Sequence, residues 1–178
     1  WTDAYPELGR GPVSFEDCVS EEFYEKEIEH VFKKTWLYIG RVEQLPQQGS
    51  YITRELGFAQ TSVILVRGRD DVIRALHNIC PHRGNKLLWR DDPFLEVQGQ
   101  APLFFCRFHG WRYALDGSLI APTRKDLLLD FDADSCRVPQ IQCEVWEGFI
   151  FINLNPDNTE PLRSFLGELA HGIEGYPF

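Results

Sequence analysis

Two short Cys/His motifs limit the possible folds of this 178-residue chain more than any other feature. The first is Cys80-Pro81-His82 followed by Arg83-Gly84, and the second is Cys106-Arg107-Phe108-His109 followed by Gly110-Trp111. Together they supply two thiolates and two imidazoles. This donor set suits a tetrahedral zinc ion, or a [2Fe–2S] centre in which two His replace two Cys on one iron. Either centre requires a fold that brings two loops side by side.

The order of the ligands favours the iron–sulfur centre over zinc. Each motif carries one Cys and one His, so two adjacent loops can give both Cys to one iron and both His to the other. A lone buried Cys or His is more often a core residue, but here both motifs are present and both are followed by Gly, whose backbone can approach a cluster closely. We therefore expect metal ligands at Cys80, His82, Cys106 and His109, with Arg83, Gly84, Gly110 and Trp111 beside them.

The two motifs resemble those of the Rieske [2Fe–2S] domain in the α (large) subunit of bacterial aromatic-ring-hydroxylating oxygenases. Further segments resemble the family's pattern in the same order: Asp116-Gly117, Ala121-Pro122-Thr123, Lys125-Asp126-Leu127, Trp146-Glu147-Gly148-Phe149-Ile150 and Tyr176-Pro177-Phe178. The sequence departs from the family at two places. Twenty-three residues separate His82 from Cys106, so we expect an insertion from Trp89 to Ala101. Phe108 stands where many relatives carry Tyr, which removes a hydroxyl near the second ligand pair.

The resemblance implies an electron-transfer role in the terminal component of an aromatic-ring-hydroxylating dioxygenase. The domain would accept electrons from a ferredoxin or reductase and pass them to a mononuclear non-haem iron in the catalytic domain of the same or a neighbouring subunit. His30, His77 and His171 are scattered, so we expect no catalytic residue and no mononuclear iron site within these residues. The chain alone is then an electron carrier, and we interpret it as a fragment of a homo- or hetero-oligomeric enzyme.

Two alternatives remain at this point, a self-contained Rieske-type ferredoxin and a structural zinc module. The predicted N-terminal helix and the tail from Pro161 to Phe178 exceed what a minimal carrier needs, which disfavours the ferredoxin. Neither ligand loop has a spare Cys, unlike the respiratory branch of Rieske proteins, which favours the oxygenase branch. No function is predicted for Cys18, Cys136 or Cys143.

The charge and hydropathy patterns exclude other classes of partner. A net charge of −9 argues against nucleic acid. No apolar run approaches the roughly 18 residues of a membrane span, so we expect a bacterial cytoplasmic protein. Basic residues nevertheless flank the ligand loops and could attract an acidic electron donor: Arg83, Lys86, Arg90, Arg107 and Arg112.

The spacing of turn residues predicts a mainly β, antiparallel Rieske fold with the cluster at loop tips. We expect an N-terminal helical extension (1–35), the Rieske domain (36–155), and a linker with a short C-terminal helix leading to a catalytic domain (156–178). The first helix should run from a Ser20 cap to about Thr35, and the last should open at Pro161. Predicted strands are Tyr51 to Leu56, Thr61 to Arg67, Val72 to His77, Leu103 to Phe105, Arg112 to Leu115, Ser118 to Ile120, Ile141 to Trp146 and Phe149 to Leu154. Asp116-Gly117 predicts a type I′ turn, and Glu147-Gly148 predicts a second hairpin. We expect the loop at Ala121-Pro122 to cover the cluster.

Overall fold

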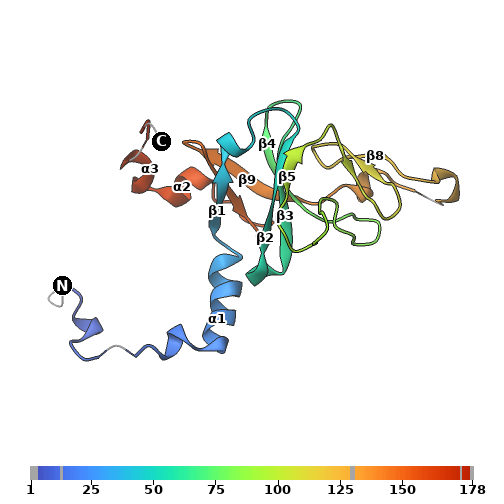
Figure 1. The fold of residues 1–178 in the computed structure, drawn as a ribbon. Helices are drawn as coiled ribbons and strands as arrows, with labels where there is room; N and C mark the ends of the chain where they lie inside the picture. Colours follow the sequence, from blue (N-terminus) through green and yellow to red (C-terminus); the bar gives the residue numbers. More distant parts are fainter. Residues whose placement is uncertain (1–3, 13, 129–130, 173, 177–178) are drawn as a thin grey trace.

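Antiparallel strands form the body of the protein in a computed structural model that describes residues 4–12, 14–128, 131–172 and 174–176 (Figure 1). A seven-stranded sheet has the order β1-β10-β9-β4-β3-β2-β5, and a three-stranded sheet has the order β6-β7-β8. The predicted mainly β, antiparallel architecture is confirmed. The strands are β1 (Trp36–Arg41), β2 (Ser50–Leu56), β3 (Thr61–Arg67), β4 (Ile73–His77), β5 (Gln98–Gln100), β6 (Phe104–Phe105), β7 (Arg112–Tyr113), β8 (Leu119–Ala121), β9 (Gln140–Trp146) and β10 (Phe149–Asn153).

Strand β3 separates two hydrophobic cores. Its apolar run Val63-Ile64-Leu65-Val66 is fully buried, which is typical of a strand covered on both faces. Val63 and Leu65 point into one core, with residues of β1, β9 and β10. Ile64 and Val66 point into the other, which also contains both motif cysteines and residues of the three-stranded sheet. The second core therefore joins the two sheets beneath the predicted ligand loops.

The two hairpin predictions had different outcomes. Glu147 and Gly148 both have positive φ, at 47° and 79°, and they connect directly paired strand ends, as a two-residue type I′ hairpin requires. The type I′ turn predicted at Asp116-Gly117 is wrong, because only Gly117 has positive φ, at 84°. The Gly117 N–H donates to the Ala114 carbonyl, and the Asp116 carboxylate accepts from the N–H and hydroxyl of Ser118. Because the Ala114 N–H also donates to the Ser118 carbonyl at 2.8 Å, the turn closes with a glycine bulge at Gly117.

The N-terminal segment runs away from the two sheets (Figure 1). Its first elements are the 3₁₀ turns Pro6–Leu8 and Glu16–Cys18. Helix α1 (Glu21–Glu27) begins at Ser20, whose hydroxyl accepts a hydrogen bond from the Phe23 N–H at 3.2 Å, as predicted. The helix continues only as a π-helical stretch, Ile28–Phe32, so its last turns differ from the expected α-helix. No residue of α1 or this stretch is buried.

Two short helices follow the sheets where one was predicted. Helices α2 (Leu162–Leu166) and α3 (Glu168–Gly172) lie near β1 and β9 (Figure 1). Gly167, with φ at 52°, breaks the predicted single helix. The Trp36 indole donates to the Glu160 carbonyl at 3.0 Å and fixes the start of this segment to β1. Of the family-like final residues, Pro177 and Phe178 lie outside the described part of the chain.

Candidate metal centre

The two predicted ligand loops come from different sheets. The first loop follows β4 of the seven-stranded sheet, and the second connects β6 to β7 of the three-stranded sheet. Both motifs therefore lie at the ends of strands, as predicted. Strand ends give a site rigid support while leaving the loop backbone free to adopt turns.

Each loop makes the same turn around its cysteine. The Cys80 carbonyl accepts the Gly84 N–H at 2.9 Å, and the Cys106 carbonyl accepts the Gly110 N–H at 2.8 Å. Gly84 and Gly110 both lie in the left-handed region, with φ at 70° and 74°. A side chain at Gly110 would also collide with the Thr123 hydroxyl, because its Cβ would lie 2.8 Å from that oxygen. The glycines are thus required by backbone conformation, and Thr123 places the segment after β8 against the second loop.

The two cysteine thiols are buried together under the loops. Cys80 and Cys106 are 1% and 2% exposed. Burial raises the pKa of Cys80, and the neighbouring Cys106 thiol adds to the rise. The Tyr113 hydroxyl lies 3.0 Å from Cys80 Sγ, and the Asn85 amide lies 3.9 Å from Cys106 Sγ. Burial, and then Cys80, raises the pKa of Tyr113 well above its usual range, so its hydroxyl keeps its proton and can donate to sulfur.

The two imidazoles form a second pair. The His82 and His109 ring centroids are 4.9 Å apart, and their planes are inclined by 68°. His109 Nδ1 is buried and has no hydrogen-bond partner among the described residues. A buried polar atom without a partner is rare and requires an explanation. Burial lowers the pKa of His82, with the charges of His109 and Arg83 as further causes, so the ring is held neutral with a lone pair free for a metal.

The residues present fit a two-iron centre. Their donors form a thiol pair and an imidazole pair. Within the described ranges, no three Cys, His, Asp or Glu side chains are placed so that they could together hold a single metal ion. A tetrahedral zinc site gathers its ligands around one point. A centre with one Cys-ligated and one His-ligated iron takes them in pairs. His109 Nδ1, which has no hydrogen-bond partner among the described residues, is a nitrogen that could bind an iron of such a centre.

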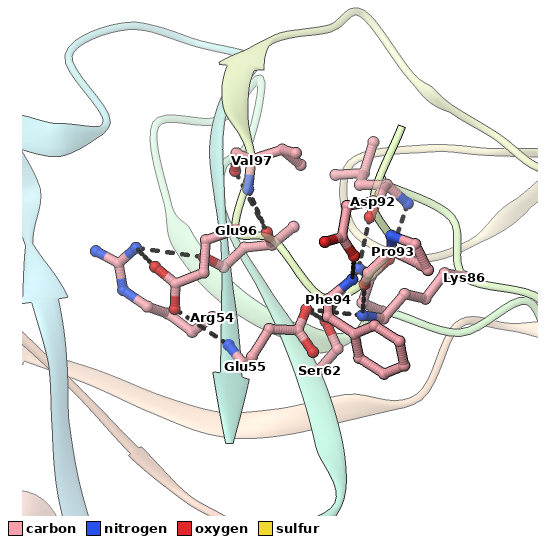
Figure 2. Close-up of polar contacts among 12 residues, drawn as sticks. Arg54, Glu55, Ser62, Lys86, Asp92, Pro93, Phe94, Glu96 and Val97 are labelled. Atoms are coloured by element: carbon pink, nitrogen blue, oxygen red, sulfur yellow. Dashed lines mark hydrogen bonds and ion pairs between the residues drawn. The ribbon is translucent and has the colours of Figure 1, made fainter. Parts of the chain in front are cut away.

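The segment predicted as an insertion is attached to the ligand loops. Lys86, just beyond the first loop, lies 2.9 Å from the Glu55 carboxylate and also contacts the Pro93 carbonyl (Figure 2). On the second loop, the Arg107 guanidinium lies 5.2 Å from the centre of the Trp89 ring. Trp89 and Pro93 therefore contact one side chain on the second loop and one just beyond the first.

The same segment is anchored to β2. Arg54 pairs with Glu96 at 2.9 Å (Figure 2), and the Thr53 side chain accepts the Val97 N–H at 2.8 Å. Residues 98–100 then form β5, which pairs with β2. Between these anchors, Phe94 and Leu95 remain 81% and 63% exposed. The segment from Trp89 to Ala101 thus includes the edge strand β5 and presents two apolar side chains to solvent.

Sequence reasoning located the four ligand candidates, the two glycines and Trp111, all of which the structure brings together. Arg83 is exposed, and its charge acts on His82. Tyr113 was missed as a functional residue. The signal was its alternation with Trp111 near the start of β7, which turns both side chains toward the same buried face.

The fold, the paired donors and the loop glycines define a Rieske [2Fe-2S] domain. The chain belongs to that family, whose model matches residues 35–141, and its predicted cofactor is confirmed. Within the described stretches, no helix has the length and apolar character of a membrane span.

Relatives of the chain are oxygenase subunits. It is 35% identical over 155 residues to the carnitine monooxygenase oxygenase subunit of Escherichia coli (strain K12), covering 86% of this chain and 39% of that protein. It is 30% identical over 150 residues to the 2-aminobenzenesulfonate 2,3-dioxygenase subunit alpha of Alcaligenes sp, covering 83% and 36%. The chain thus spans less than half the length of these relatives.

Solved structures agree with this assignment. A quaternary ammonium Rieske monooxygenase, described with carnitine oxidation and inter-subunit electron transfer, matches with a TM-score of 0.78 and 31% identity. The match covers 89% of this chain and 41% of that one. Naphthalene 1,2-dioxygenase with bound indole matches with a TM-score of 0.75 and 28% identity, covering 87% and 33%. The predicted likeness to oxygenase α subunits is confirmed, whereas a restriction to aromatic substrates is not.

Proposed function

We propose that the chain is the electron-transfer domain of a Rieske oxygenase, with Cys80 and Cys106 on one iron and His82 and His109 on the other. The observations that carry this proposal are the pairing of the two thiols, the pairing of the two imidazoles, and a buried His109 Nδ1 that has no hydrogen-bond partner among the described residues. When bound, the cluster supplies one-electron transfer, at a higher potential than all-Cys clusters because neutral imidazoles replace thiolates.

The surrounding residues have separate tasks in this function. The loops and the core below them exclude water from the two thiols, and the Tyr113 hydroxyl lies 3.0 Å from Cys80 Sγ, where it can donate a hydrogen bond to a Cys80 thiolate. His82 and His109 are only half-buried, so their rings lie closer to the protein surface than the thiols do. Electrons therefore have a short route between a docked partner and the imidazole side of the site.

We infer that the electron donor, a ferredoxin or a reductase, presents an acidic surface. The supporting feature is a set of exposed arginines around the ligand loops that form no ion pair with any described residue: Arg83, Arg90, Arg107 and Arg112. Exposed Phe108 lies on the second loop, and exposed Phe105 ends β6 beside it, at 57% and 50% exposure. Apolar side chains bordered by arginines are typical of transient protein interfaces.

For the whole protein we propose an oxygenase in which this domain, residues 36–155, reduces a mononuclear iron in a catalytic domain of the same or a neighbouring subunit. All strands of the described residues lie between Trp36 and Asn153, which supports the domain limits. Identities of 30–35% to carnitine and glycine betaine oxygenase subunits favour a quaternary ammonium substrate. An aromatic substrate is the second candidate, favoured by the 2-aminobenzenesulfonate dioxygenase relative. Product analysis with these three substrates and the full-length protein separates the two.

Electron paramagnetic resonance (EPR) of the dithionite-reduced protein tests the ligand assignment. We expect the low average g value that distinguishes mixed His/Cys ligation from all-Cys ligation. Cys80→Ser and His109→Ala should lose this signal, while His109→Cys should keep a cluster of ordinary ferredoxin type at lower potential. Cys143→Ser and His77→Gln are matched controls, because both residues lie outside the loops, and they should keep the signal.

A colourless, EPR-silent protein containing zinc would instead establish the structural zinc module. A reading frame that stops at Phe178 in the natural gene would favour the self-contained ferredoxin, and one that continues into a catalytic domain would support the oxygenase.

A further inference from the structure

The two candidate imidazole ligands are supported by very different neighbours. His82 lies flat against the Trp111 indole, with ring centroids 4.4 Å apart and planes inclined by only 6°. Trp111 is 4% exposed. His109 instead contacts Phe108, at 3.9 Å and 41°, and Phe108 is 57% exposed. One imidazole therefore rests on a buried aromatic surface and the other lies beneath a solvent-exposed ring.

Trp111 is itself held from two sides. Its carbonyl accepts the Cys106 N–H at 2.9 Å, which fixes its backbone to the second loop. The Phe131 ring meets the indole edge-on, at 5.8 Å and 88°. Because His82 belongs to the first loop, the stack crosses from one ligand loop to the other.

Among the described residues, stacking rather than a hydrogen bond orients the His82 ring. A metal-bound His normally donates its second ring N–H to a carboxylate or carbonyl, which sets the ring plane. The His82 ring has no hydrogen-bond partner within the described residues, and rotation about the last side-chain bond of His is only weakly restricted. A flat contact with a fixed indole restricts that rotation.

We propose that Trp111 is a positioning residue for His82, and that its indole sets the plane in which this imidazole meets the iron. The inference rests on the ligand role proposed above for His82. It differs from simple core packing, in which Trp111 would stabilise the domain without any particular effect on one imidazole.

The test compares Trp111→Leu and Trp111→Phe with Trp146→Leu in cluster-loaded protein. Trp146 is a half-buried indole in the β9–β10 hairpin, stacked near Phe149. Trp146→Leu is the control, because it removes aromatic packing away from the ligand loops. Pulsed EPR resolves the nitrogen couplings of the two ligand imidazoles, and transfer of iron to a chelator measures how firmly the cluster is held.

We expect Trp111→Leu to change the nitrogen coupling of one imidazole while the coupling of the other stays the same. The variant should also release iron about 10-fold faster than the unmutated protein. Trp111→Phe keeps an aromatic surface, so its coupling should shift in the same direction by less. Trp146→Leu should retain both couplings and the release rate. If Trp111→Leu does not fold, a Trp111→Phe spectrum identical to that of the unmutated protein overturns the proposal.

Unchanged couplings in folded Trp111→Leu, or equal changes at both imidazoles, also overturn it. These results are distinct from failure of the proposed function, in which the unmutated protein itself would show no nitrogen-coupled cluster signal.

Discussion

Replacing Tyr113 by Phe removes one hydroxyl from the buried side of the site. The Tyr113 ring is fully buried in the core that joins the two sheets, and Phe keeps that packing. The change deletes the only described hydroxyl within 3.0 Å of Cys80 Sγ. We expect the midpoint potential of the cluster to fall, because a hydrogen bond to sulfur stabilises the more negative, reduced state more than the oxidised state.

The size of the shift follows from the strength of that bond. Hydrogen bonds contribute about 0.5–1.5 kcal/mol when neutral and about 1.5–3 kcal/mol when one partner is charged. One added electron should therefore strengthen this bond by about 1 kcal/mol. Since a factor of ten corresponds to about 59 mV for a one-electron couple, the midpoint of Tyr113→Phe should fall by about 40 mV.

Protein-film voltammetry measures this shift directly. Tyr51→Phe is the matched control, because Tyr51 packs against the same core while its hydroxyl lies over Gly99 rather than beside a ligand. Its midpoint should equal that of the unmutated protein. A Tyr113→Phe midpoint equal to or above the unmutated value, with the cluster retained, would refute the assigned role of the hydroxyl.

Three further predictions concern residues around the loops. Asn78→Ala should lower the free energy of unfolding by about 2–4 kcal/mol in urea titrations, because the Asn78 side chain accepts the N–H groups of Leu87 and Leu88; an unchanged midpoint would contradict this. Burial lowers the pKa of His77, so the unfolded state binds more protons in acid and stability should fall as the pH drops below about 6.5. His77→Gln should weaken that dependence between about pH 8 and pH 5.5, and an identical dependence would count against it. Phe108→Tyr should raise the midpoint potential, and an unchanged or lower value in voltammetry would show that the added hydroxyl does not reach the cluster.

The sequence predicted those parts of the site that depend on local spacing. Two motifs with one Cys and one His each were enough to specify paired donors, and Gly84 and Gly110 are where the backbone turns back on its cysteine. The Glu147-Gly148 hairpin was predictable for the same reason, because its turn conformation depends on its own residues.

Features set by distant contacts were not predictable in this way. Tyr113 became a partner of Cys80 only when the three-stranded sheet packed against the larger one. Strand β5 contains Gly99 and no apolar residue, so its pairing with β2 had no pattern to reveal it. At Asp116, hydrogen bonds to Ser118 favoured a bulge over the turn that the Asp-Gly pair predicted.

The origin of the two ligand loops in different sheets gives the cluster a mechanical role. A group bound by both Cys80 and Cys106 would be a covalent cross-link that closes a loop of about 26 residues. Such a cross-link lowers the conformational entropy of the unfolded chain, which by the chain-entropy estimate for disulfides adds about 3 kcal/mol to the free energy of unfolding. The three-stranded sheet consists of strands of only two or three residues, so we expect it to depend most on this cross-link. Loss of iron should therefore unfold β6, β7 and β8 before the seven-stranded sheet. The electron carrier would then also stabilise the sheet that forms part of its own binding site.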